Sequence, residues 1–145
     1  MDLKARVLEV LQNTHLMSLA TQDDGGIWVA DVIFIHDDDL NMYWMSHPEC
    51  RHSKAISGNI RVAGTITTST KGGEPNFGIQ FEGTAEKIEG ARHDLTVKHF
   101  SKRGRPAPSE TEDVLEGDSW YKFTPSKIRL IDEQNFGYDV QDVSL

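Results

Sequence analysis

Short β-forming segments that end at tight turns are the feature that most constrains how this chain can fold. Apolar and β-branched residues predict six strands, at residues 16–22, 27–36, 40–46, 60–68, 78–88 and 120–132. Turn signals such as Asp23-Asp24-Gly25-Gly26 and Asp37-Asp38-Asp39 separate neighbouring strands. Strands and helices do not alternate as they would in a parallel sheet. The pattern therefore predicts a small closed antiparallel barrel with short helices.

The segments outside the strands are expected to be helices or loops. Apolar residues at helical spacing predict helices over residues 2–13 and 90–103, and the basic residues at 98–105 are expected to be a solvated helix end. Residues 104–118 contain two prolines and five acidic residues, which predicts a mobile loop. Residues 136–145 are expected to form a short C-terminal tail.

The acidic balance of the chain limits its partners. Over 145 residues the formal net charge is −8 and the pI is about 5.1, which argues against nucleic acid or an anionic membrane as the main partner. A site for an anion must then be a local cluster of basic residues. The length predicts one domain over residues 1–145. A single cysteine, Cys50, and the lack of an apolar signal or spanning segment predict a cytoplasmic protein.

Residues 42–59 combine a strand, a tight turn and a short helix. The strand ends at His47-Pro48, because proline cannot donate to a ladder and restricts the residue before it. Backbone N–H groups at the start of the helix attract a phosphate. A hydroxyl and three basic side chains surround the turn: Ser46, Arg51, His52 and Lys54. Because Arg51 can bind a phosphate with two parallel hydrogen bonds, the pattern predicts an anion site, with a solvated helix start as the alternative.

Other residues in this region have simpler interpretations. His47, Cys50 and His52 resemble a zinc cluster, but no fourth ligand stands at a standard spacing, so no metal site is predicted. Cys50 has no base or orienting carboxylate beyond Glu49, so a thiol nucleophile is not predicted. Bulky aromatic residues are expected in the core or at a subunit interface: Trp28, Phe34 and Trp44.

The order of several short motifs resembles the FMN-binding split-barrel family, whose best-known members are the pyridoxamine 5′-phosphate oxidases. In that family a strand ends in an aromatic-Thr/Ser pair, and Arg-Lys opens a helix five residues later. Met45-Ser46 and Arg51-His52 have this spacing here. Within the family, the motifs resemble the YhbP-like bacterial branch, and the resemblance covers about residues 5–138. It also rests on Ser57-Gly58, Val62-Ala63-Gly64-Thr65, the run from Gly78 to Gly83, and Phe136-Gly137-Tyr138.

The resemblance implies a mainly β (α+β) fold, a six-stranded antiparallel split β-barrel, with FMN as its cofactor. The side chains around the turn at residues 46–54 would hold the FMN phosphate, and the strand upstream would contact the flavin ring, covered by Val32 and Met45. Thr67 and Gln80 are candidates whose alternative is an ordinary strand position facing solvent. The implied cofactor-binding set is Ala30, Asp31, Val32, Ile33, Met45, Ser46, Arg51, His52, Lys54, Thr67 and Gln80. No catalytic residue is assigned.

The sequence departs from the family pattern at two places, and these departures limit the activity that can be expected. His52 replaces the family's lysine, and the Arg-x-His that binds the vitamin substrate is absent after Ile131. Oxidation of pyridoxamine 5′-phosphate is therefore not expected. The resemblance implies an FMN-dependent oxidoreductase that acts on an unknown small molecule and works as a homodimer. The alternatives are a non-catalytic flavin- or haem-binding carrier or sensor dimer, and a barrel that has lost its cofactor and serves as an interaction module.

Overall fold

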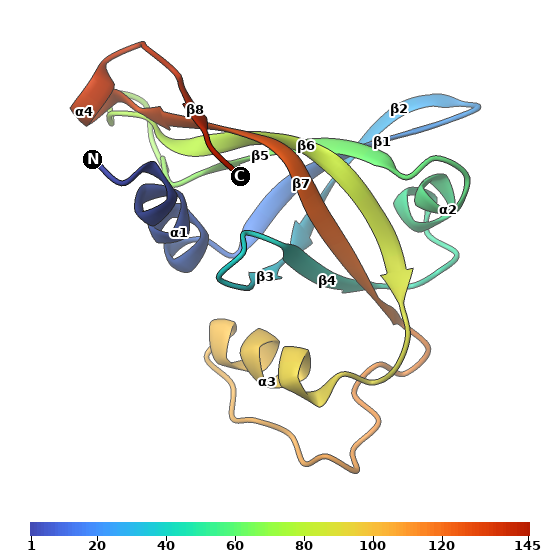
Figure 1. Cartoon of the computed structure of the whole chain (residues 1–145). Helices are drawn as coiled ribbons and strands as arrows, with labels where there is room; N and C mark the ends of the chain where they lie inside the picture. The colour runs from blue at the N-terminus through green and yellow to red at the C-terminus, as the bar shows by residue number, and fades with distance from the viewer.

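One antiparallel sheet of eight strands forms the framework of the protein, and the computed structural model describes residues 1–145. Four helices accompany the sheet. In chain order (Figure 1) the elements are α1 (Leu3–Asn13), β1 (Leu16–Asp23), β2 (Gly26–Ile33), β3 (Ile35–His36), β4 (Met42–Ser46), α2 (Arg51–Gly58), β5 (Arg61–Thr67), β6 (Phe77–Ile88), α3 (His93–Lys102), β7 (Ser119–Asp132), α4 (Glu133–Phe136) and β8 (Gln141–Val143).

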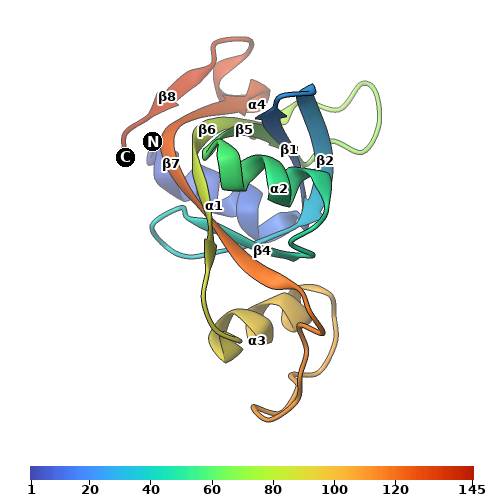
Figure 2. The same ribbon diagram turned by 90° about the vertical axis from the view of Figure 1, so that its right-hand side faces the viewer.

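The sheet is a barrel that is split between its two end strands. Across the sheet the strand order is β2-β1-β5-β6-β7-β4-β3, with β8 paired to β7. The end strands β2 and β3 are consecutive in the sequence, with Phe34 between them. The sheet therefore curls back on itself without a ladder that joins its two edges, as Figures 1 and 2 show. This arrangement confirms the predicted antiparallel split barrel with short flanking helices.

The number of strands differs from the prediction at two places. The strand predicted at residues 27–36 is divided at Phe34, whose N–H donates to the carbonyl of His15 (N···O 3.1 Å). The Phe34 ring is fully buried, so the chain turns there to place it in the core. The predicted tail at residues 136–145 contains β8, which pairs antiparallel with β7. Both additional strands are only two or three residues long, too short for periodicity to reveal.

Two helices close the ends of the barrel. The apolar stripe of α1 predicted from the sequence is buried, with Val7, Val10 and Leu11 fully inaccessible. Burial of each such side chain contributes roughly 1.5–3 kcal/mol. At the other end, α2 buries Ala55 and Ile56. In Figure 1 the two helices stand on opposite sides of the strands, so the start of α2 lies at the rim of the barrel.

Proline in a strand predicts an interruption near Pro125, but β7 continues through this position with a β-bulge. In the pairing of β6 with β7, Glu82 lies opposite Lys127 and Gly83 opposite Pro125, which leaves Ser126 as the extra residue. The Ser126 hydroxyl donates to the carbonyl of Glu82 (3.2 Å). A Cβ at Gly83 would collide with the Thr124 carbonyl, so glycine permits the close approach of the two backbones.

The apolar strand β2 is not covered on both faces within one chain. Its nearly continuous apolar sequence is typical of a strand covered on both faces, and the structure contradicts that expectation: Ile27 is 73% exposed and Val29 57% exposed. Trp28, expected in the core or at a subunit interface, is 47% exposed. The reason is position, since β2 is the end strand of the sheet path and no element of the same chain covers its outer side. These apolar side chains are therefore exposed in the single chain.

The α3 helix lies beside β3 and β4, away from the rest of the barrel (Figures 1 and 2). The basic end of α3 is only partly solvated, because the Lys102 ammonium is half-buried and donates to the carbonyl of Leu11 (Nζ···O 3.1 Å). Residues 103–118 form neither helix nor strand, and their mobility stays a prediction. None of the helices has the length and apolar character needed to cross a membrane.

Candidate functional site

The connection from β4 to α2 has the predicted strand–turn–helix form. Strand β4 ends at Ser46, and α2 begins at Arg51 after the turn that holds Pro48. Cys50 takes the N-cap position without a side-chain hydrogen bond to the helix. The backbone N–H groups of Arg51, His52 and Ser53 have no hydrogen-bond partner in the chain, as is usual for a first helical turn without a cap. The rim of the barrel therefore presents free N–H donors at the positive end of a helix dipole.

Ser46 and His52 meet across this turn. The Ser46 hydroxyl lies 2.9 Å from the Nε2 atom of His52. Burial lowers the pKa of His52 below its ordinary value of 6.5, so its imidazole is neutral at pH 7. A neutral imidazole can still donate one hydrogen bond to an anion. The pair brings a hydroxyl and a ring N–H to the start of α2.

Cys50 belongs to the same cluster. Its Sγ atom lies 3.0 Å from the Ser53 hydroxyl and 3.4 Å from Nε2 of His52. The expectation that Cys50 has no base nearby is therefore wrong, because the turn folds the imidazole back over the thiol. His47 does not join them, since its Nδ1 accepts from the N–H of Glu49 (3.1 Å). No group of three His, Cys, Asp or Glu residues in the structure is placed to hold a metal ion.

Arg51 is held by an internal carboxylate. Its Nε donates to Oδ2 of Asp23 (3.1 Å) and its Nη2 donates to Oδ1 (3.2 Å). The guanidinium carbon lies 4.5 Å from the centre of the Trp28 ring. The side chain of Arg51 stays 38% exposed. The hydrogen bond from Arg51 lowers the pKa of Asp23 below its usual range, so the carboxylate remains charged in the contact.

Sequence reasoning missed both partners of Arg51. Asp23 was interpreted only as part of a hairpin turn, and its carboxylate does serve that turn by accepting the N–H of Gly25 (2.9 Å). The second role depends on how close the hairpin tip comes to α2, which no local pattern reveals. Lys54, the remaining basic residue, lies 3.5 Å from Glu49 in an exposed ion pair. Such a pair contributes little to stability, so Lys54 is free to turn toward another anion.

The four residues predicted to meet the flavin ring all lie on β2. Because β2 is an end strand of the sheet, one side of its backbone makes no ladder hydrogen bonds. The Val32 side chain is buried in the core, so Val32 can offer a ligand only its backbone. Asp31 accepts a hydrogen bond from the Ser18 hydroxyl (2.6 Å) on the outer face of the sheet. Ala30 and Ile33 are both half-buried.

Three further predicted residues have other neighbours within one chain. Met45, at the end of β4, packs against the small cluster around Trp120. Gln80 is exposed on β6, where it is paired with Thr65 on β5 and with Arg129 on β7. Thr67 is at the far end of β5 and accepts the N–H of Ser69 (3.1 Å). The structure brings Ser46 and His52 into contact, while the Arg51 side chain at the start of α2 turns to Asp23. Thr67 and Gln80 lie on the outer face of the sheet.

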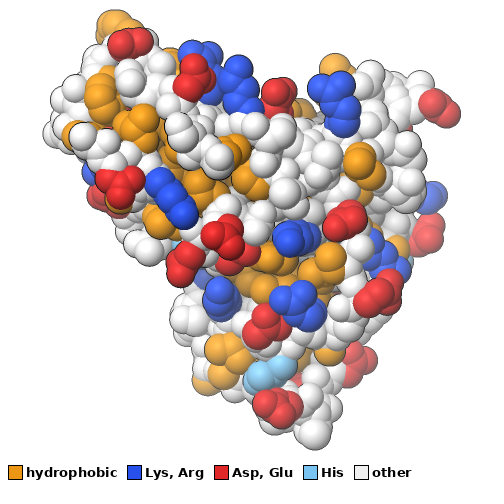
Figure 3. Space-filling model, viewed as in Figure 1, with side chains coloured by type: hydrophobic (Ala, Val, Ile, Leu, Met, Phe, Trp, Pro, Cys, Tyr) orange, Lys and Arg blue, Asp and Glu red, His pale blue; other side chains and the backbone are white.

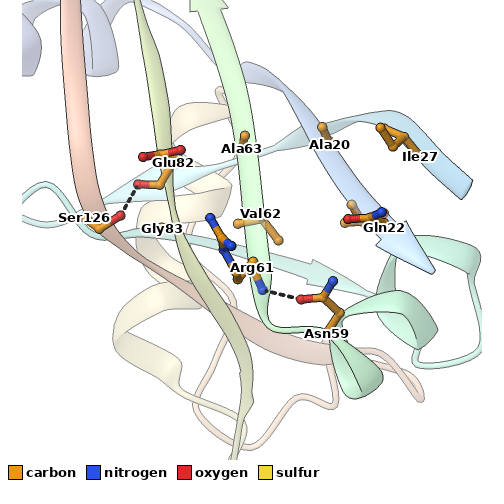
Figure 4. A pocket seen from close by; sticks show the side chains of 11 residues that line it. Ala20, Gln22, Ile27, Asn59, Arg61, Val62, Ala63, Glu82, Gly83 and Ser126 are labelled. Carbon is orange, nitrogen blue, oxygen red and sulfur yellow. Dashed lines mark hydrogen bonds between the residues drawn. The ribbon is translucent and has the colours of Figure 1, made fainter.

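A groove of about 360 Å³ crosses that outer face (Figure 4). Its floor consists of small residues such as Ala20, Ala63 and Gly83, and polar side chains of Gln22, Asn59, Arg61 and Glu82 stand along it. A smaller groove of about 230 Å³ continues past Gln80 toward Lys127 and Arg129. Small residues on a broad sheet face allow another surface to approach closely.

Comparison with known proteins identifies the fold family. The family described as Pyridoxamine 5′-phosphate oxidase matches residues 3–132, which is most of the chain. The chain belongs to the pyridoxamine 5′-phosphate oxidase family. This membership, with the antiparallel barrel, confirms the resemblance inferred from the short motifs.

Relatives of this chain include bacterial proteins of the UPF0306 group. A UPF0306 protein of Enterobacter is 26% identical over 104 residues, which cover 71% of this chain and 73% of the relative. The YhbP protein of Escherichia fergusonii is 28% identical over 94 residues, or 64% of each chain. The chain thus matches about two thirds of the length of these relatives, in agreement with the expected YhbP-like branch.

Solved structures of other proteins share this architecture at low sequence identity. A conserved hypothetical protein of Mycobacterium tuberculosis has a TM-score of 0.80 with 15% identity, covering 97% of this chain and 91% of the other. HutZ of Vibrio cholerae, described as a haem storage protein, has a TM-score of 0.71 with 16% identity. The match covers 90% of this chain and 95% of HutZ. These similarities establish the fold.

Proposed function

We propose that this protein binds FMN and acts as a flavin-dependent oxidoreductase on a small molecule. The observation that carries the proposal is the contact of Ser46 with His52 (2.9 Å) at the uncapped start of α2, where Arg51 is the first helical residue. The membership in the pyridoxamine 5′-phosphate oxidase family supports the same assignment.

The donor set at the β4–α2 turn suits the phosphate of FMN. A phosphate accepts hydrogen bonds from backbone N–H groups at a helix start, and three such groups are free here. Arg51 adds a planar fork that matches an oxyanion, provided that the phosphate displaces Asp23 or shares the guanidinium with it. Ser46 and His52 add neutral donors, and Lys54 can add a second positive charge.

The open side of β2 suits the polar edge of a flavin. An isoalloxazine presents alternating donors and acceptors along one edge, and the backbone of Ala30, Asp31, Val32 and Ile33 offers the same kind of groups. When bound, the flavin itself supplies the redox chemistry. The chain's own contribution would be to hold the phosphate and the ring edge, and no side chain is assigned as a general acid.

A homodimer would bring the remaining predicted residues to the site. The exposed residues Ile27 and Val29 lie on the same outer face as the groove floored by Ala20 and Ala63. Exposed apolar side chains beside a groove floored by small residues suit the close approach of a partner. Pairing two copies through this face would bury it and could carry Thr67 and Gln80 of one copy toward the flavin of the other.

The spectrum of the purified protein tests the proposal. After incubation with FMN and removal of free cofactor, we expect a flavin absorbance spectrum, bleaching by a reduced nicotinamide, and recovery in air. A flavin spectrum without bleaching would favour the carrier or sensor. A sharp Soret band after incubation with haem, without retention of FMN, would overturn the flavin assignment in favour of the haem-binding alternative. Retention of neither cofactor would favour an interaction module.

A further inference from the structure

A second basic site lies on the opposite side of the barrel from α2, between α1, β3 and α3. A pocket of about 440 Å³ is lined there by Gln12, Ile35, His36, Asp38, Val97, Lys98, Ser101 and Lys102. Its volume falls in the range of about 300–1,000 Å³ that is common for small-molecule sites. In Figure 1, β3 stands between α1 and α3, so three separate elements form the walls.

The two lysines of this pocket have no acidic partner. None of the ion pairs in the structure includes Lys98 or Lys102. Asp38 also lines the pocket, but it is exposed and forms no ion pair. The Lys98 ammonium lies 3.5 Å from the carbonyl of His36. Both ammonium groups therefore line one pocket without a carboxylate bound to either, in a chain with a net charge of −8 whose basic and acidic side chains are mixed over the face in Figure 3. Their field also lowers the pKa of His36, after the larger effect of burial.

The Lys102 ammonium makes only one hydrogen bond within the protein. Its ammonium donates to the carbonyl of Leu11 (3.1 Å) near the end of α1 and lies 4.0 Å from the centre of the Phe34 ring. An ammonium has three N–H donors, so this one keeps donors for a further partner. Burial lowers the pKa of Lys102 to about 8, because removal of a charge from water is costly unless it is paired. An anion in the pocket would offset that cost.

We propose that the pocket between α1, β3 and α3 binds the oxyanion group of a small metabolite, a phosphate or a carboxylate, through Lys98 and Lys102. Lys102 would contact the anion at the inner end of the pocket. Lys98, one helical turn earlier on α3, would contact it at the exposed end. The Ser101 hydroxyl lies on the same wall and can donate to the anion. This site is separate from the β4–α2 turn and does not depend on flavin binding.

The test is an amide-resolved NMR titration of the full chain with inorganic phosphate and, separately, with succinate. We expect saturable shifts at residues 97–102 and at His36, with the stronger ligand identifying a phosphate or a carboxylate as the preferred group. In a Lys98→Met/Lys102→Met variant these shifts should require at least tenfold more ligand. Because loss of Lys102 can disturb packing, Lys98→Met alone, at an exposed position, should still weaken binding several-fold.

The matched control is Lys71→Met/Lys87→Met, which changes the net charge equally at two exposed lysines outside the pocket. It should bind the two anions as the wild type does. Equal weakening in both double variants would show that only overall charge matters and would overturn the proposal. Shifts confined to residues 46–54, with none on α3, would also overturn it while leaving the β4–α2 site intact.

Discussion

Asp23 and Arg51 form a bidentate ion pair between the β1–β2 hairpin and the first turn of α2, with N···O distances of 3.1 and 3.2 Å. The carboxylate thus takes the position on the guanidinium fork that a phosphate oxygen pair would take. In the proposed function, Asp23 competes with the cofactor for Arg51.

Replacement of Asp23 should strengthen FMN binding. In Asp23→Asn the side chain keeps an acceptor for the Gly25 N–H but loses the negative charge beside the phosphate. We expect FMN to bind several-fold more tightly and riboflavin, which lacks the phosphate, to bind as before. Fluorescence titration with both flavins measures this. As a control, Asp24→Asn alters the exposed neighbour in the same hairpin and should change neither affinity; weaker FMN binding by Asp23→Asn would contradict the competition.

Removal of Arg51 should weaken FMN binding by at least about tenfold. Each charge-assisted hydrogen bond contributes about 1.5–3 kcal/mol, and about 1.4 kcal/mol corresponds to one decade in affinity. Arg51→Ala loses the fork, and Arg51→Lys should recover only part of the affinity because a point charge lacks its geometry. Titration of the same variants with riboflavin should show almost no effect. Wild-type protein that binds riboflavin as tightly as FMN would exclude a phosphate site at this turn.

The dimer should depend on the apolar face of β2. Ile27→Asp/Val29→Asp places two charges at exposed positions, so the barrel should fold while the proposed interface does not form. Sedimentation at micromolar concentration should show a dimer for the wild type and a monomer for the variant, with flavin lost along with dimerisation. Tyr138→Asp, at a position that is 94% exposed near the C-terminus, should remain dimeric. A wild-type monomer with bound FMN would refute the shared site.

Pyridoxamine 5′-phosphate should be a poor substrate despite the family membership. A phosphorylated substrate needs its own cationic contact. The last arginine of the chain, Arg129, lies 3.2 Å from Asp142, and no histidine follows His99. A peroxide-coupled assay on the flavin-loaded protein should therefore show little or no turnover. Rapid turnover at micromolar substrate would show that another part of the chain binds the vitamin phosphate.

Acid should destabilise the protein partly through His99. This side chain is buried against Trp120, with ring centres 6.0 Å apart, and its Nδ1 has no partner. Burial, followed by the charges of Arg103 and Lys102, lowers the pKa of His99 from 6.5 to about 4. The neutral ring is therefore favoured in the folded state. Its contribution to the free energy of unfolding is complete above pH 6.5 and is lost as the pH falls toward 4, by on the order of 3 kcal/mol.

Urea unfolding at pH 7.5, 6.0 and 5.0 measures this loss. The non-titrating His99→Phe variant should show a shallower decline than the wild type over the same range. Identical declines for wild type and His99→Phe would show that other groups cause the acid sensitivity.

Features that rest on local sequence patterns could be predicted, and contacts between residues far apart in the sequence could not. Strand alternation and the apolar stripe of α1 are local patterns, so the antiparallel barrel and α1 were predictable, whereas the four-residue α4 was not predicted. The turn from Ser46 to Arg51 was also predictable, because it rests on spacing. The Asp23 contact was not, since it joins residues 28 positions apart, and neither was the half-buried state of Lys102, which depends on α1 and Phe34. Thr67 and Gln80 stay predictions because their approach to the site would require a second chain.

The pairing of β4 has a consequence for how the protein is made. Strand β4 (Met42–Ser46) pairs only with the two-residue β3 and with β7 (Ser119–Asp132). During synthesis, pairing can therefore begin early among β2, β1, β5 and β6. Strand β4 can pair with β7 only after the last quarter of the chain has left the ribosome. Such dependence on distant segments slows folding and leaves apolar strands exposed in the meantime. We expect a nascent chain that stops before β7 to be bound by chaperones and the complete chain to be released from them.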